Sequence, residues 1–426
     1  MHLARVEARA RSARSFLDGR RHMFSETRSE FAPHGPSVDA LIALASIPGA
    51  ESYLAPGDID YRSWNHVGDP LCEALIHVMR ERKLMGGDIY ANARELERGG
   101  NSEATAFFAD VEAIPSWLDV DSLRVGARMG RRNPLGMLFG IHGALPMTYL
   151  DPATAEVMSS TGRLAGGGDF RRRFWETATG FVGALDVDGM LPGGDRWIMW
   201  IRIRFMHTMI RLGIHRSARW PRYESGTPIS QMATAGATYI FGQYRVNIME
   251  YFGGKVTPDE RDGFALMWRW VSRIEGANNQ LLGRDHAEEM AIQMRIHDTL
   301  FSESDKTKTL MRDVVEGTAS MAAFGKSTWL NHAVARQVLQ PSMIATFPGG
   351  DARDALGLEP RPTAEAVVRL GAGALRAVSS VTRLPGVRRI AEEGGFRLLE
   401  SSLERGLDGV RADYRGTAVA GRPTDE

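Results

Sequence analysis

The residues whose types and spacing best suit chemistry lie on two stretches joined by a short loop. The first stretch reads DFRRRFWETATGFVGALDV and carries Arg173 and Thr177 one helical turn apart. The loop, Asp188 to Asp195, reads DGMLPGGD, and the second stretch, RWIMWIRIRFMHTMIRLGI, carries His207. Because the loop is short, the two helices are expected to pack antiparallel. A guanidinium, a hydroxyl and an imidazole would then share one helical hairpin.

The helical rise places these three side chains at similar heights. Measured from the loop, Thr177 lies roughly 16 Å and Arg173 roughly 22 Å along the first helix. His207 lies roughly 18 Å along the returning helix. Arg173 and Thr177 should therefore bracket His207 in height across the hairpin.

The returning helix is apolar nearly all round, which indicates burial. It nevertheless carries Arg202, Arg204 and Arg211 beside His207. Because a buried, unpaired arginine is strongly destabilising, an anion should meet these groups. Carboxylate side chains and the two propionates of a haem both fit, and a purely structural core histidine remains a third alternative.

Composition narrows the class of protein. The chain has 426 residues, 52 Lys+Arg against 52 Asp+Glu, 43% hydrophobic residues and 24% charged residues, as in an ordinary globular protein. Zero net charge argues against a nucleic-acid binder, because few phosphates would be neutralised. The one cysteine, Cys72, excludes an internal disulfide, a thiolate cluster and a covalently attached c-type haem.

The elements that must position these residues are helices, because helical periodicity dominates and alternating apolar-polar stretches are almost absent. We predict an all-α fold with one large helical domain. The predicted helices are Pro70–Leu84, Ser102–Val111, Leu118–Arg131, Asp169–Leu185, Arg196–Leu212, Ile229–Phe252, Pro258–Leu282, Ala287–Leu300 and Lys306–Ala323. Thr257 and Glu260 form a predicted capping box at the start of one of them.

The predicted division of the chain has four parts. Residues 1–36 are an N-terminal extension, 37–345 the helical domain, 346–363 a linker, and 364–426 amphipathic helices with a disordered tail. No export signal is visible at the N-terminus, and the longest apolar run, Leu135 to Leu150, contains His142 and Pro146. We therefore expect a cytoplasmic protein.

The C-terminal helices carry regularly placed arginines. These are Arg369, Arg376, Arg383, Arg388 and Arg389. A solvated face docked on the main domain would explain them, and so would weak peripheral contact with a membrane.

The hairpin resembles a known family. Arg-x-x-x-Thr in RRRFWETATG, a Gly-Pro loop and Arg-x-x-His in RIRFMHTMIR are similar to the core of the rubber oxygenase (latex clearing protein) and MpaB-type oxygenase family. Two further stretches resemble family motifs, namely GTPISQMATAGATYIFG and FALMWRWVSRIEGANNQLL. The resemblance covers roughly Leu118 to Ala322.

The resemblance implies a globin-like helical core that holds a non-covalent b-type haem. His207 would match the proximal iron ligand, with its other ring nitrogen at a carbonyl or carboxylate. Arg204 and Arg211 would be the cofactor-binding arginines. Arg173 and Thr177 would match distal residues whose donors stabilise negative charge that develops on dioxygen, and Glu156 would match a proposed base.

Two positions depart from the family pattern: Glu176 stands where relatives carry a lysine, and Met232-Ala233 replaces an acidic pair. The expected activity is that of a haem b-dependent oxygenase that uses dioxygen on an apolar, isoprenoid- or lipid-like substrate, with cleavage of a carbon-carbon double bond. A haem- or lipid-binding carrier or sensor without turnover is the alternative. A third reading is a helical protein without haem.

Overall fold

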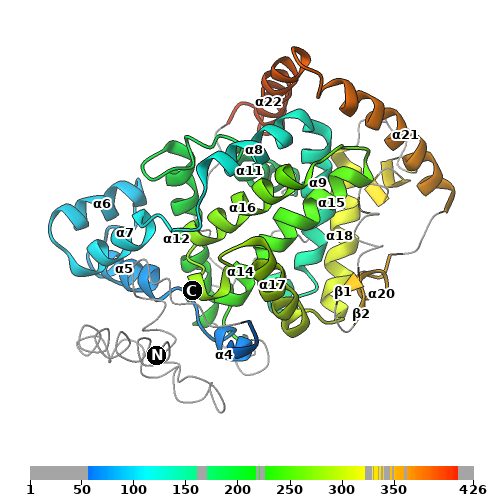
Figure 1. Ribbon diagram of the computed structural model, residues 1–426. Coiled ribbons are helices and arrows are strands. Elements are labelled where there is room, and N and C mark those ends of the chain that lie inside the picture. The colour runs from blue at the N-terminus through cyan, green and yellow to red at the C-terminus, as the bar shows by residue number, and fades with distance from the viewer. Residues whose placement is uncertain are drawn as a thin grey trace.

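A computed structural model describes most of the chain: residues 56–160, 170–216, 220, 226–321, 329, 331–333, 335, 336, 339, 346, 347, 350–358 and 362–410. Across these residues the chain is almost entirely helical (Figure 1). Strand pairing within them is limited to β1 (Thr346–Phe347) and antiparallel β2 (Gly350–Asp351). The predicted all-α class is confirmed, while the globin-like arrangement of the core stays a prediction.

The described residues contain the following helices. In chain order they are η3 (Pro56–Asp58), α4 (Tyr61–Trp64), α5 (Pro70–Glu81), α6 (Ile89–Arg98), α7 (Ser102–Glu112), α8 (Val120–Arg132), α9 (Pro134–Thr148), α10 (Pro152–Ser160), α11 (Phe170–Gly183), α12 (Asp195–His215), α14 (Gln231–Tyr239), η4 (Ile240–Tyr244), α15 (Arg245–Tyr251), α16 (Pro258–Ile274), η5 (Asn279–Leu281), α17 (His286–Leu300), α18 (Asp305–Met321), α20 (Ala352–Leu356), α21 (Pro362–Val381) and α22 (Val387–Gly406).

Helix α16 runs through the middle of the core (Figure 1). It begins with the predicted capping box of Thr257 and Glu260, and every residue from Gly263 to Ile274 is buried. Its backbone touches that of α8, because a Cβ at Gly126 would lie only 2.3 Å from the Gly263 carbonyl carbon. The two glycines therefore let α8 and α16 pack without intervening side chains.

Helices α11 and α12 form the predicted antiparallel hairpin. A Cβ at Gly180 would lie 3.3 Å from the Trp200 ring, and one at Gly183 would lie 3.3 Å from Cδ of Arg196. The step of three residues from Gly183 to Gly180 on α11 thus matches the step of four residues from Arg196 to Trp200 on α12. Continued by one turn, this register brings Thr177 to about the height of Arg204, so that His207 lies closer in height to Arg173, one turn further along α11.

Two predicted helices differ from the structure at their ends or middle. The predicted helix Ile229–Phe252 is α14 and α15 separated by the π-helical turn η4. The predicted helix Pro258–Leu282 ends at Ile274, because Gly276 adopts a φ of +97°. Helices α4, α6, α9, α10 and α20 are additional to those predicted.

The predicted linker 346–363 contains β1, β2 and α20, and α20 buries Ala352, Ala355 and Leu356. This segment folds because its three apolar residues pack against the core. The predicted extension 1–36 and the tail 411–426 lie outside the described residues. No helix within the described ranges is long and apolar enough to cross a membrane.

Candidate functional site

His207 lies in the middle of α12, and its side chain is 33% exposed. Its Nδ1 atom is 3.6 Å from Oε1 of Glu275, just beyond hydrogen-bond distance. Desolvation, assisted by the positive charge of Arg211, lowers the pKa of His207 to about 4. The imidazole is therefore neutral near pH 7, which is the form that binds a metal.

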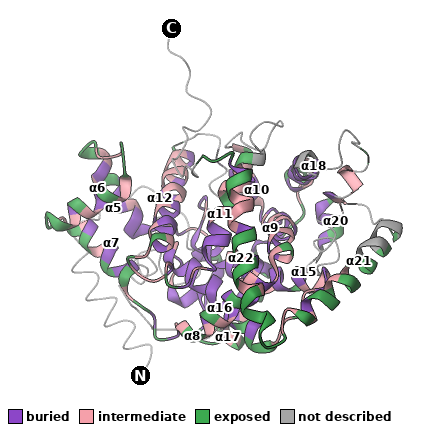
Figure 2. Cartoon of the chain, turned by 90° about the horizontal axis from the view of Figure 1, so that it is seen from above, coloured by how far each residue is buried: buried purple, intermediate pink, exposed green. Residues whose placement is uncertain are grey.

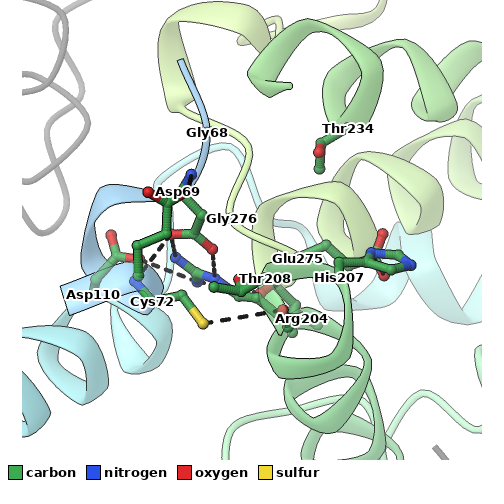
Figure 3. Close-up of polar contacts among 12 residues, drawn as sticks. Gly68, Asp69, Cys72, Asp110, Arg204, His207, Thr208, Thr234, Glu275 and Gly276 are labelled. Carbon is green, nitrogen blue, oxygen red and sulfur yellow. Dashed lines mark hydrogen bonds and ion pairs between the residues drawn. The ribbon is translucent and has the colours of Figure 1, made fainter. Parts of the chain in front are cut away.

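Glu275 follows the last residue of α16, and its side chain is only 10% exposed. Burial raises the pKa of this carboxyl to about 8, although the Arg204 charge opposes the shift. Its Oε1 atom is buried without a hydrogen-bond partner among the described residues. A proton-bearing carboxyl thus faces one ring nitrogen of His207, and Nε2 is the nitrogen left for a ligand (Figure 3).

Arg204 forms the buried ion-pair cluster shown in Figure 3, on the opposite side of α12 from the imidazole. Its Nε and Nη2 atoms donate to Asp69 at 2.6 and 2.9 Å, and Nη1 lies 3.4 Å from Asp110. Arg273 from α16 donates to the same Asp110 at 2.7 Å. The cluster thus ties α5, α7, α12 and α16 together.

Gly276 makes room for this cluster next to Glu275. A Cβ at Gly276 would lie 2.7 Å from both Nε of Arg204 and Oδ2 of Asp69. The side chain of Gln231 holds the same turn, because its Nε2 donates to the Gly276 carbonyl and its Oε1 accepts from the backbone N–H of Asn278, both at 2.8 Å. These contacts fix where α16 ends and therefore where Glu275 stands.

Arg211 lies one turn beyond His207 and is also paired. It donates to Oε1 of Glu73 at 3.1 Å and to the Ile229 carbonyl at 2.7 Å, with a further bond to the Pro228 carbonyl at 3.0 Å. The sequence leaves open whether Arg204 and Arg211 meet carboxylate side chains or haem propionates. In the structure both arginines bind carboxylate side chains, Asp69 and Glu73. The propionate-binding assignment of both arginines stays a prediction that these contacts do not favour.

The predicted distal residues lie on α11. Thr177 is exposed and Arg173 is half-buried. Arg173 lies close to Tyr149, where its charge opposes the burial that raises the pKa of the phenol. On the same helix, between Arg173 and Thr177 in sequence, Phe174 stacks on His142 with ring centroids 3.9 Å apart. The roles of Arg173 and Thr177 stay predictions.

The two glutamates of interest contact other groups. Glu156, on α10, forms an ion pair with Lys306 of α18 and accepts from the Ser160 hydroxyl at 3.5 Å. Glu176 accepts from Nε of Arg172 at 2.9 Å. The catalytic assignment of Glu156 likewise stays a prediction.

Sequence reasoning missed Glu275, Asp69 and Asp110. The predicted helix Pro258–Leu282 carries Glu275 in its interior, although the following Gly276 is a typical signal for a helix end. Asp69 and Asp110 are 135 and 94 residues from Arg204, and no local pattern connects them to it.

The chain matches the family model described as ER-bound oxygenase mpaB/B'/Rubber oxygenase, catalytic domain, over residues 128–377, more than half of its length. It is 22% identical over 312 residues to the rubber oxygenase of Streptomyces sp. (strain K30), a match that covers 72% of this chain and 73% of that protein. Its fold is similar to the structure of latex clearing protein LCP in the closed state, with a TM-score of 0.55, 18% identity, and 79% of this chain and 90% of that chain covered. The chain therefore belongs to the mpaB/rubber oxygenase catalytic-domain family and is an oxygenase, a class of oxidoreductase.

Proposed function

We propose that the chain is a haem b-dependent oxygenase in which His207 is the proximal iron ligand. The observation that carries the proposal is the neutral imidazole whose Nδ1 faces the buried carboxyl of Glu275. Proximal histidines of haem proteins need a neutral ring and a partner on the second nitrogen, which fixes the tautomer and the ring plane. His207 has the neutral ring, and its Nδ1 faces the orphaned Oε1 of Glu275 at 3.6 Å, an acceptor of the kind that an Nδ1–H requires.

A b-type haem bound at His207 would supply the iron at which dioxygen reacts. The protein's own contribution is positional. Glu275 orients the imidazole, Gly276 and Gln231 hold Glu275 in place, and the Arg204–Asp69 pair anchors α12 against α5. Buried supporting residues of this kind hold a functional side chain in place before its ligand binds.

We assign Arg173 and Thr177 to the opposite, distal side. The hairpin register supports this placement, since it carries Arg173 to about the height of His207 on the neighbouring helix, with Thr177 one turn away. A guanidinium and a hydroxyl can both donate to an oxygen atom that gains negative charge. Thr177 is exposed, so its hydroxyl is accessible to a ligand.

We propose an apolar substrate of isoprenoid type. The similarity to a protein named rubber oxygenase supports this class. Cleavage of one carbon-carbon double bond by one dioxygen molecule gives two carbonyl groups, each carbon receiving one oxygen atom, and needs no further oxidant or reductant.

The proposal is tested on the purified full chain from haem-supplemented cells. We expect a Soret band, a b-type pyridine haemochrome, and oxygen uptake with polyisoprene or shorter isoprenoids. Haem without uptake would favour a carrier or sensor. A colourless, folded protein would contradict the proposal altogether.

A further inference from the structure

Large exposed apolar side chains are concentrated at one end of the described chain, on α21, α22 and the turn between them. The outer apolar face, as we call it, consists of Leu370, Val378, Val381, Leu384, Val387 and Ile390, of which Leu370 is 78% and Ile390 is 72% exposed. Figure 2 shows α21 at the edge of the molecule, with most of its described surface exposed. A patch of this kind on a soluble domain marks an interaction surface.

The orientation of α21 is fixed by its opposite side. Ser379 accepts a hydrogen bond from the Lys255 backbone N–H at 2.9 Å, and Gly253 packs directly against the Ala372 carbonyl. Leu370 lies nine positions before Ser379, which is about 180° round the helix. The apolar side chains therefore point away from the protein because the helix is docked by its small and polar residues.

The second helix is also anchored. Arg132 of α8 donates to Glu392 at 2.6 Å, and the guanidinium of Arg131 lies 4.2 Å from the centre of the Phe396 ring. Arg383, in the turn, donates to Glu260 at 3.0 Å. The turn that carries Leu384 and Val387 is thus held at both ends and presents these side chains outward.

Basic residues outnumber acidic ones around the outer apolar face, with Glu365, Glu392 and Glu393 at the two ends of this stretch. From Ala366 to Ala391 the chain has five arginines and no acidic residue. Arg389 pairs with Glu393 one turn further along α22, and an exposed pair of this type is weak enough for a phosphate to compete. Arg388 pairs with Glu392, which is largely buried and also accepts from Arg132. Two copies of this face would bring like charges together, which disfavours self-association through it.

We infer that the outer apolar face binds the surface of an anionic lipid bilayer. Apolar side chains flanked by arginines on a docked, outward-facing helix fit the interface of a bilayer, where the side chains enter the acyl boundary and the guanidinium groups meet lipid phosphates. The helix lies along the surface, and the inference does not depend on haem or on the proposed substrate.

The test is co-sedimentation of the full chain with vesicles of phosphatidylcholine alone or mixed with phosphatidylglycerol. We expect binding to the mixed vesicles that weakens at high salt, and little binding to phosphatidylcholine. Replacing Arg369 and Arg376 by Gln should lower the partition about fivefold for each charge removed. The double variant Leu370→Gln/Ile390→Gln should lower it at least about tenfold.

Two control variants change exposed residues elsewhere, Ile114→Gln, at a side chain that is 58% exposed, and Arg82→Gln. They should bind like the wild type, and all variants should melt like it. Equal losses in the controls, or no binding of the wild type to anionic vesicles, would overturn the inference. So would light scattering that shows a dimer which Leu370→Gln/Ile390→Gln converts to a monomer, because the face would then bind a second copy.

Discussion

The Nδ1 atom of His207 lies 3.6 Å from Oε1 of Glu275, so the residue that ends α16 stands beside a side chain in the middle of α12. We predict that Glu275→Leu lowers haem affinity about 10–100-fold, because the imidazole loses its orienting partner. Glu275→Gln should restore most of it, since the amide oxygen can accept the same N–H. Haem titration of the folded apoprotein measures both, and equal affinity of all three proteins would show that Glu275 has no orienting role.

His207→Ala is predicted to lose most of the haem without unfolding the chain, because the change removes a ligand but little buried volume. His297→Gln is the matched control. His297 is buried against Phe301 and Tyr239, and desolvation lowers its pKa to about 4, as for His207. Haem content per folded chain is measured by pyridine haemochrome and circular dichroism. A full haem complement in His207→Ala would move the ligand assignment to another histidine.

Arg173→Ala is predicted to keep haem but to slow oxygen uptake per haem about 10²–10³-fold, the usual cost of losing one preorganised donor to a developing anion. Thr177→Val removes only the hydroxyl and should cost less if Arg173 is the main donor. Uptake per haem that stays at the wild-type level in both variants, together with lower thermal stability, would mean that the two side chains are structural.

The hairpin of α11 and α12 could be predicted from sequence because its determinants are local. A Gly-Pro loop joins two periodic segments, and the register follows from the rise per residue. The partners of Arg204 could not be predicted in the same way. That an anion should meet it follows from the cost of a buried charge, but Asp69 reaches it only through the packing of α5 on α12.

The position of Glu275 shows the same limit at shorter range. Helical periodicity continues past Ile274, and a helix predicted to Leu282 would carry Glu275 in its interior. The structure instead ends α16 at Ile274, where Gly276 accepts a positive φ and admits the Arg204–Asp69 pair against its backbone. The helix end thus depends on contacts made by residues from other helices.

Arg204→Met is predicted to destabilise the fold by about 3–5 kcal/mol, because Asp69 remains buried without its partner. The double variant Arg204→Met/Asp69→Asn should recover much of the loss, since Asn keeps the N-cap of α5 without the charge. Urea denaturation measures the stability, and haem content per folded chain is measured alongside. Loss of haem from a chain of wild-type stability would instead support Arg204 as a propionate ligand.

The pH dependence of stability follows from histidines that are kept neutral in the fold. Burial lowers the pKa of His297 to about 4, below the value of about 6.5 in the unfolded chain, so the unfolded state binds more protons between these values. This histidine therefore adds stability at neutral pH that is lost as the pH falls from 6.5 to 4.

The predicted size of this effect is about 1.4 kcal/mol per pH unit within that window. Glu275 acts in the opposite direction, because its raised pKa lets the folded chain hold a proton up to about pH 8. The slope of the wild type alone is therefore a sum of opposing terms, and His297→Gln isolates the histidine. Both proteins are unfolded with urea from pH 7.5 to 4.5. As the pH falls, the wild type should lose more free energy of unfolding than His297→Gln, because only the wild type has the buried neutral histidine. A difference that stays constant across this range would mean that His297 is protonated in the folded chain as readily as in the unfolded one.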